Sequence, residues 1–413
     1  MGHRPIGMDR SNKRTAQVAL GVVVAGAMAW GGSELRAAQD AERRGSEALK
    51  LLSASIERAP ELTKLPSARA IAVLEAALQE RTTDRLEGLT IWARALDAAQ
   101  KGRPEDARSG VAKAQKALLD EPAAVRAELA VLEGVIALQL GEPAVAGRAA
   151  HMALTLDAKN ARARVLSADV ALEQKHAREA LAQLATLGAQ ADKHATFVNR
   201  RGLALEQQGE LEAARAAYER ASQLDPTFGQ SQINLGRLFR DEGKHVQAEA
   251  AFGRAVNALP NDSEAWLGRG LSRIAQGDLS SGGLDLEQAR ALAPAQSAPL
   301  IALADLDVAR AELAHAIDRY RAALLLEPAH AVAWLKLGNA LMRDANYGGA
   351  KNAYETAIRH DGALAAAHNG LGAARMALGD NDGALAALTT AVKLDDRDPN
   401  PARNLELLRT RMQ

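Results

Sequence analysis

The sequence predicts an all-α protein, a solenoid of antiparallel helix pairs. Only 3% of its 413 residues are aromatic, whereas strands need aromatic and β-branched residues in short alternating runs. Alanine and leucine, which favour helices, dominate instead. A pattern of two amphipathic helices also recurs every 34 residues through the C-terminal half. One such pair cannot bury its apolar face alone, so the copies must stack on one another.

The charge balance and the absence of cysteine exclude several classes of function. Lysine and arginine number 51, and aspartate and glutamate also number 51. A balanced chain lacks the concentrated basic face that nucleic acid requires, so we expect no nucleic-acid partner. The chain has no cysteine, which excludes disulfides, thiolate zinc sites, a cysteine nucleophile and a lipid-anchored bacterial N-terminus.

The N-terminus carries a candidate membrane segment. A basic tail, residues 1–14, precedes an apolar segment, residues 15–33, whose centre is uncharged. As a helix that centre covers roughly 25 Å, close to the ~30 Å of a hydrocarbon core. The preceding basic residues favour a cytoplasmic N-terminus, with the rest of the chain outside. We expect an uncleaved signal anchor. The alternatives are a signal peptide cleaved at Ala27–Ala29 and a cytosolic chain with an apolar start.

Residues 34–87 are expected to form a helical hairpin and linker. An amphipathic pattern predicts one helix from Ser33 to Ala59, after which Pro60 and Pro66 break the chain. A second helix is predicted from about Ser67 to Gln79. Its apolar stripe cannot be buried alone, so we expect it to pack on the repeats that follow.

Six regular repeats occupy residues 195–398. Small residues recur at positions 8, 20 and 27 of each copy, large ones at positions 4 and 24, and proline at position 32 in four copies. Two helices approach closely only where side chains are small, and proline ends each unit because it cannot continue a helix. Glycine marks the turn between the two helices in four copies. The copies are 195–228, 229–262, 263–296, 297–330, 331–364 and 365–398.

This pattern resembles the tetratricopeptide repeat family, whose members form right-handed superhelical solenoids. The resemblance is specific over 195–398 and weaker over 88–194, where three divergent copies keep the spacing but lose most signature residues. Five residues, Pro122 to Arg126, separate the first two of those copies. Residues 399–413 are expected to form the polar capping helix that follows a last repeat.

The family resemblance implies a partner-binding groove lined by the first helix of each pair. Asparagine amides can bond an extended backbone, and arginine can pair with a carboxylate. The carboxylate clamp of chaperone-binding members is matched only in part, because Asn199 replaces a lysine and Leu267 a cation. Solvated residues of no particular affinity are the alternative. Carried over by register, the groove residues are Asn199, Asn234, Arg237, Arg240, Lys336, Asn339, Arg343 and Asn369.

No catalytic, metal or cofactor motif emerges. The nine histidines form no HExxH motif and no pair four residues apart. Gly268–Gly270 and Gly370–Gly372 imitate a dinucleotide loop but occupy close-packing positions of the repeat. Gly379–Gly383 faintly resembles a calcium loop, yet it falls in a turn between helices and lacks the late glutamate. The tryptophans at the large packing positions, Trp92, Trp266 and Trp334, are expected in the core. We therefore expect neither enzyme activity nor a cofactor.

These observations predict a non-enzymatic scaffold that binds partner proteins or peptides. The anchor and the repeats together resemble bacterial inner-membrane proteins with one N-terminal span and a periplasmic repeat domain. That resemblance implies a role in envelope assembly, secretion or maintenance. The principal alternative is a self-assembling part of a secretion, pilus or polysaccharide-export machine. A third is an enzyme accessory with an unrecognised activity in Gly88–His194. The client, the pathway and the oligomeric state stay open.

Overall fold

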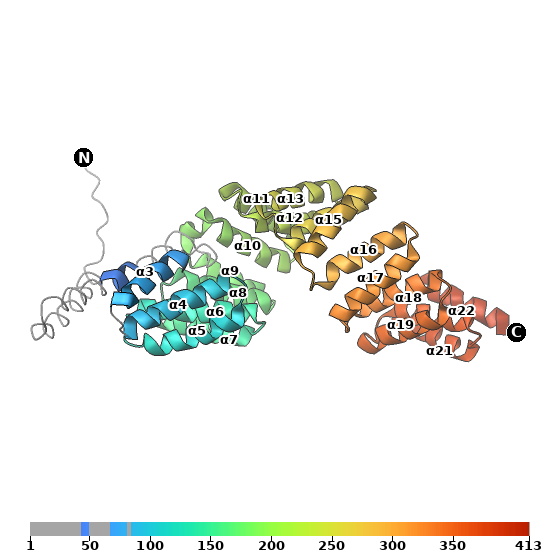
Figure 1. Ribbon diagram of the computed structural model, residues 1–413. Helices are drawn as coiled ribbons and strands as arrows, with labels where there is room; N and C mark the ends of the chain where they lie inside the picture. The colour runs from blue at the N-terminus through green and yellow to red at the C-terminus, as the bar shows by residue number, and fades with distance from the viewer. Residues whose placement is uncertain (1–42, 49–66, 81–83, 413) are drawn as a thin grey trace, which may run out of the picture. The chain divides into compact units, whose positions relative to one another are not determined.

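Every secondary-structure element in the described part of the chain is helical. The computed structural model describes residues 43–48, 67–80 and 84–412, and these ranges contain no strand (Figure 1). The apolar segment 15–33 lies outside the described residues. Within the described ranges, no helix combines the length and the apolar character needed to cross a bilayer.

The chain forms two compact units, which are described separately. Unit 1 ends at Glu210 and unit 2 begins at Leu211. This division falls between the two helices of the first regular repeat, 195–228, whereas the repeat pattern changes from divergent to regular at residue 195. The two divisions differ because one follows the density of contacts and the other follows signature residues.

Unit 1 contains the divergent repeats and the helix that precedes them. The predicted helix from Ser67 is present, and it packs on α4. Pro122 to Arg126 do not form a loop, because α6 begins at Ala123 and the extra residues make its first turn. The helices are α3 (Ser67–Glu80), α4 (Asp84–Gln100), α5 (Pro104–Ala117), α6 (Ala123–Gln139), α7 (Pro143–Leu156), α8 (Ala161–Glu173), α9 (Ala177–Ala185), the 3₁₀ helix η3 (Gly188–Lys193) and α10 (Ala195–Gln207).

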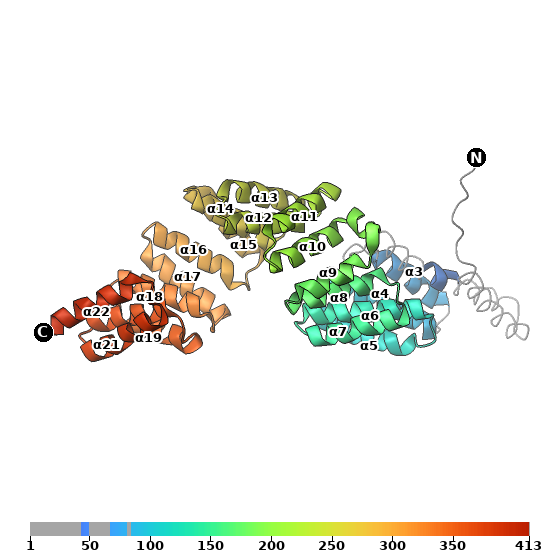
Figure 2. The same ribbon diagram turned by 180° about the vertical axis from the view of Figure 1, so that it is seen from behind.

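Unit 2 follows the 34-residue spacing without a break (Figures 1 and 2). First helices cover positions 1–13 of each repeat, second helices cover positions 17–30, and a capping helix ends the chain. The helices are α11 (Leu211–Leu224), α12 (Gly229–Asp241), α13 (His245–Ala258), α14 (Ser263–Ala275), α15 (Leu279–Leu292), α16 (Ser297–Ala309), α17 (Leu313–Leu326), α18 (Ala331–Arg343), α19 (Tyr347–His360), α20 (Ala365–Ala377), α21 (Asn381–Leu394) and α22 (Pro399–Met412).

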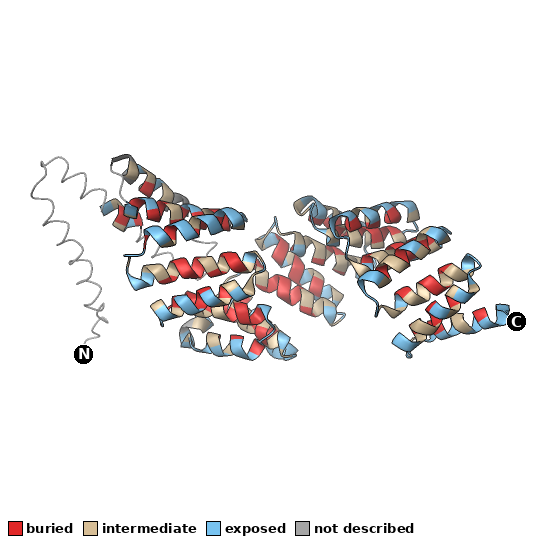
Figure 3. Cartoon of the chain, turned by 90° about the horizontal axis from the view of Figure 1, so that it is seen from below, coloured by how far each residue is buried: buried red, intermediate tan, exposed pale blue. Residues whose placement is uncertain are grey.

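An aromatic side chain at position 24 fills the space between consecutive repeats. Phe252 is fully buried, and a Cβ atom on Gly236 or Gly268 would lie 2.7 or 2.3 Å from its ring. These two glycines therefore let two first helices close on the same ring. Tyr354 is held in the same way by Gly338 and Gly370. The packing role predicted for the glycines of Gly268–Gly270 is confirmed. Figure 3 shows the buried residues along the facing sides of the helices.

Candidate functional site

The first helices of unit 2 share a surface that we call the first-helix face. It carries positions 2, 5, 6, 9, 12 and 13 of α12, α14, α16, α18 and α20. Successive first helices contact one another between α12 and α14, α14 and α16, and α18 and α20. Seven of the eight predicted groove residues lie on this face, and Asn199 lies on α10 of unit 1.

The predicted residues of α12 differ in how far they are exposed. Asn234 is 1% exposed, so its amide lies within the protein. Arg237 and Arg240 are about one-third exposed, at 36% and 34% of their side chains. Their carboxylate neighbours are distant for hydrogen bonds: Arg237 lies 3.6 Å from Glu264, and Arg240 lies 3.6 Å from Asp241. Both guanidinium groups are thus positioned to bind a carboxylate from outside.

Lys336 on α18 is bound to an acidic neighbour on the preceding first helix. Its ammonium group donates to Asp305 of α16, and the side chains are 34% and 40% exposed. The same carboxylate accepts a hydrogen bond from the hydroxyl of Tyr320. Burial, followed by the bond to Asp305, raises the pKa of Tyr320 above its ordinary value. The hydroxyl therefore stays protonated and acts as a donor, and this triad ties α16, α17 and α18 together.

Asn339 and Asn369 also bind neighbouring helices. Asn339 is exposed, and its side-chain oxygen accepts a hydrogen bond of 2.8 Å from the hydroxyl of Tyr354 on α19. Asn369 on α20 accepts at 2.9 Å from Asn404 of the capping helix α22. Because Asn339 is exposed and its oxygen is the bonded atom, its amide nitrogen can donate to another group.

Arg343 is the most accessible of the predicted cations on α18. The residue is exposed, and its guanidinium donates a long hydrogen bond of 3.3 Å to the carbonyl of Val308 on α16. Such a bond holds the side chain across two first helices and leaves most of its five donors available.

Asn199 does not join these residues within one unit. It is 3% exposed on α10 of unit 1. A patch made of Asn199, Asn234 and Arg237 would span both units, so that patch stays a prediction. The burial of both asparagines means that neither presents an open amide to solvent.

An apolar strip on the first-helix face escaped the sequence analysis. It consists of positions 5 and 12 in three consecutive first helices, α14, α16 and α18, together with position 9 of α14. These side chains are half-buried: their inner sides pack on the repeat cores, and their outer sides stay accessible. The sequence does indicate this strip, because the same repeat positions that carry polar residues in other first helices carry apolar residues in these three. Members of the strip are Leu267, Leu271, Ile274, Ile301, Val308, Leu335 and Met342.

The acidic turn Gly379–Gly383 serves as a helix cap. A side-chain oxygen of Asp380 accepts from the backbone nitrogen of Gly383 at 2.9 Å, which satisfies a free donor of α21. The described ranges hold no cluster of three or more histidine, aspartate or glutamate side chains arranged for a metal.

Sequence comparison identifies tetratricopeptide repeats in this chain. One tetratricopeptide repeat family model matches residues 205–270, and a second matches residues 165–227 and 335–399. A search of curated proteins yields no match. The chain therefore contains tetratricopeptide repeats, and repeats of this type support a role as a protein-interaction scaffold.

Solved structures agree with the fold. The APC/C hetero-tetramer Cut9–Hcn1 is 15% identical with a TM-score of 0.54, over 91% of this chain and 85% of that one. PilF of Pseudomonas aeruginosa is 18% identical with a TM-score of 0.46, over 52% and 97%. YrrB, described as a repeat protein with an unusual peptide-binding site, is 16% identical with a TM-score of 0.38, over 46% and 97%. The first of these likenesses confirms the all-helical solenoid fold.

Proposed function

We propose that this protein is a non-enzymatic scaffold that binds segments of partner proteins on the first-helix face of unit 2. The apolar strip carries the proposal. Half-buried apolar side chains on three neighbouring first helices form a surface onto which apolar side chains of a partner can pack. Burying such side chains against a preformed surface is favourable, because the rigid repeats need little ordering on binding.

The charged residues around the strip define the partner further. Arg237 and Arg240 lie on α12 at one end, and Arg343 lies on α18 at the other. Among the described residues, these three cations make long polar contacts, at 3.6, 3.6 and 3.3 Å. A partner segment with apolar side chains in its middle and carboxylates near its ends would satisfy both features.

The cellular setting is part of the same proposal. We place the repeats in a bacterial periplasm, tethered by residues 15–33, where the scaffold would act in envelope assembly, secretion or maintenance. Support comes from the uncharged run behind a basic tail. In membrane fractions of the native host, the protein should resist salt washing and require detergent for release. Release by salt alone would overturn the anchor.

A photoreactive residue at position 339 tests the binding face. Asn339 is exposed on the first-helix face, whereas Gln247, which also carries an amide, is exposed on the second helix α13. Crosslinking in the native host should label a partner from position 339 and much less from position 247. Labelling from position 247 alone would show that the binding face is wrong. Adducts formed only with a second copy of the chain would favour the self-assembling alternative.

A matched pair of leucine substitutions tests the apolar strip. Leu271 belongs to the strip, and Leu284 is 75% exposed on α15 of the same repeat. L271E places a charge in the strip and should abolish capture of the crosslinked partner, whereas L284E should leave capture unchanged. Circular dichroism confirms that both variants fold. Equal capture by the two folded variants would remove the strip from the binding surface.

A further inference from the structure

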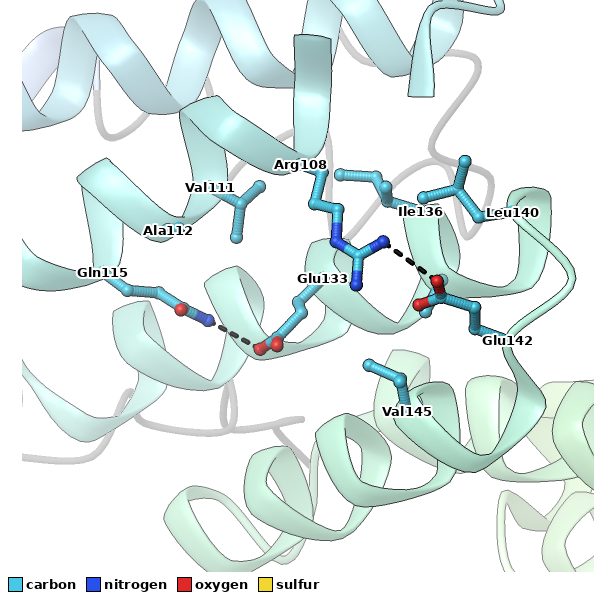
Figure 4. Close-up of a pocket in the computed structure, with 10 residues that line it drawn as sticks. Arg108, Val111, Ala112, Gln115, Glu133, Ile136, Leu140, Glu142 and Val145 are labelled. Carbon is cyan, nitrogen blue, oxygen red and sulfur yellow. Dashed lines mark hydrogen bonds and ion pairs between the residues drawn. The ribbon is translucent and has the colours of Figure 1, made fainter. Parts of the chain in front are cut away.

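Unit 1 contains a small cavity that the first-helix face does not involve. It lies between the second helix α5 and the next repeat, α6 and the start of α7, and its volume is about 120 Å³ (Figure 4). Its lining combines apolar side chains with charged and amide groups. The lining consists of Arg108, Val111, Ala112, Gln115, Glu133, Ile136, Ala137, Leu140, Glu142 and Val145.

The corresponding slot between repeats is occupied by side chains in two repeats of unit 2. In unit 2, position 21 of one second helix meets position 11 of the next first helix. Arg215 lies over the ring of Phe239, 5.6 Å from its centroid. One repeat further, Glu249 is 2.9 Å from Arg273, whose side chain crosses the slot. In both repeats a large residue at position 11 occupies the slot.

Unit 1 leaves the slot open because alanine stands at position 11. Ala137 is 3% exposed and has no side chain beyond its Cβ atom, so nothing crosses to Arg108 at position 21. The following repeat also has an alanine there, Ala171. The residue opposite it, at position 21 of the preceding copy, is Gly147, and a Cβ atom on that glycine would already lie 3.6 Å from Val170. The cavity therefore arises from a small residue at position 11 combined with a long one at position 21.

The opening of the cavity is acidic and holds an unused acceptor. Arg108 donates to one carboxylate oxygen of Glu142 at 2.9 Å, and Gln115 donates to Glu133 at 2.8 Å (Figure 4). The second oxygen of Glu142 is buried and has no hydrogen-bond partner among the described residues. Two carboxylates thus face one guanidinium, and a buried acceptor without a donor is unfavourable.

We infer that this cavity binds the side chain of an arginine from a partner protein. The aliphatic stem would lie against Val111, Ile136 and Leu140, and the guanidinium would donate to the free oxygen of Glu142. In unit 2 an arginine side chain does occupy the corresponding slot, where Arg273 pairs with Glu249 at 2.9 Å. Arginine suits the site better than lysine, since its long stem ends in a planar group with five donors and the lining holds two carboxylates.

The first experiment titrates N-acetylarginine methylamide into the full-length protein. Methyl NMR signals of Val111, Ile136 and Leu140 report the occupancy of the cavity. We expect saturable shifts with the arginine probe. N-acetylcitrulline methylamide, which has nearly the same shape without the charge, should bind at least about tenfold more weakly. Equal binding of citrulline, equal binding of the lysine analogue, or no saturable shift would overturn the inference.

Variants of the protein place the probe in the cavity. A137R supplies an arginine from position 11, as Arg273 does in unit 2, and should abolish probe binding. A144R adds the same charge at an exposed position of α7 and should leave binding unchanged. E142Q keeps the shape of the acceptor and should weaken binding about tenfold. If A137R does not fold, E142Q decides, and unchanged binding by E142Q would overturn the inference. Because the cavity lies in unit 1, these results do not depend on the first-helix face.

Discussion

The indole Nε1 of Trp266 donates a 2.8 Å hydrogen bond to the carbonyl of Pro260, and this bond joins two consecutive repeats. Trp334 makes the same 2.8 Å bond to Pro328. The acceptor is at position 32, just after a second helix has ended, where a carbonyl has no partner within the helix. At the following junction a histidine takes the place of tryptophan: the Nε2 of His368 lies 3.1 Å from the carbonyl of Gly362, which is position 32 of the preceding repeat. A carbonyl only accepts, so the Nε2 of His368 carries the proton there.

Substituting the two tryptophans by phenylalanine separates this bond from a second contact. W334F removes the hydrogen bond and a small part of the ring's packing, and loss of the bond alone should lower the free energy of unfolding by about 0.5–1.5 kcal/mol. W266F should cost more, because the guanidinium of Arg269 lies 4.6 Å from the ring centroid of Trp266 and tryptophan is the best aromatic partner of a cation. Urea unfolding measures both. A larger loss for W334F would contradict the assignment.

Gly268 is the glycine with the least room for a side chain among those that pack on Phe252. A Cβ atom there would lie 2.3 Å from the ring of the fully buried Phe252, so the ring or the helix would have to shift. G268A should therefore destabilise unit 2 by about 1–3 kcal/mol in urea unfolding.

The companion variant G253A is the matched control, because its Cβ atom would meet its nearest neighbour, Arg269, at 4.0 Å. It should unfold at least as late as the parent protein, since alanine favours a helix over glycine. Adding G268A to F252L should cost less stability than adding G268A to the parent protein, because the smaller leucine leaves room for the Cβ atom. A loss in G268A that F252L does not relieve would place the strain elsewhere.

The turn between the helices of a pair requires a left-handed residue at position 15. Six repeats place glycine there, including Gly243 with φ 72°. Ala311 and Ala345 adopt φ values of 63° and 58°, which L side chains tolerate at a cost of roughly 1–2 kcal/mol. A311G and A345G should each stabilise unit 2 by up to about 1 kcal/mol, because glycine removes the strain but frees the unfolded chain.

Thermal or urea unfolding checks these two turn variants. The control is A309G, since Ala309 is exposed at the end of α16. Glycine should destabilise that helix by up to about 1 kcal/mol. If A311G has a lower free energy of unfolding than the parent protein, the strain at the turn is negligible.

The regular spacing made the helices and their packing predictable from the sequence. Glycine and alanine at fixed positions, together with large residues such as Phe252, determine how close two helices lie, and those positions are matched by the structure. The exposure of individual polar residues was harder to predict. Asn234 and Asn339 share the first-helix face, yet one is 1% exposed and the other is exposed. Asn234 stands at position 6, which is buried in α12, α14 and α16, whereas Asn339 stands at position 9, which is not buried in these helices or in α18.

The ion pairs inside the repeats were also beyond the sequence analysis. Position 11 is usually apolar, and in two repeats the charge there pairs with an opposite charge at position 23 of the second helix. Arg273 pairs with Asp285 at 2.9 Å in one repeat, and Asp307 pairs with Arg319 at 3.0 Å in the next, with the charges exchanged. The charges at positions 11 and 23 are opposite within a repeat but change from copy to copy. A search for residues that recur in every copy therefore does not detect these pairs.

Removing either partner of the Asp307–Arg319 pair should have unequal effects. Asp307 is 2% exposed, whereas the side chain of Arg319 is 32% exposed and also pairs with Glu287 at 2.9 Å. R319A leaves a buried carboxylate without its cation and should cost about 3–5 kcal/mol at neutral pH. D307A leaves Arg319 bound to Glu287 and should cost less. In a double-mutant cycle, the two losses should not add, with a coupling of about 0.5–3 kcal/mol.

The loss in R319A should shrink as the pH falls. Burial raises the pKa of Asp307, and Arg319 opposes that rise, so R319A raises the pKa further. The folded state then binds the proton more tightly than the unfolded chain does. The free energy of unfolding of R319A therefore rises relative to the parent as the pH falls from the raised pKa toward the ordinary value. Urea unfolding of R319A, D307A and the parent between neutral and acidic pH measures this change. Parallel curves for R319A and D307A would show that the buried carboxylate is not the source of the loss.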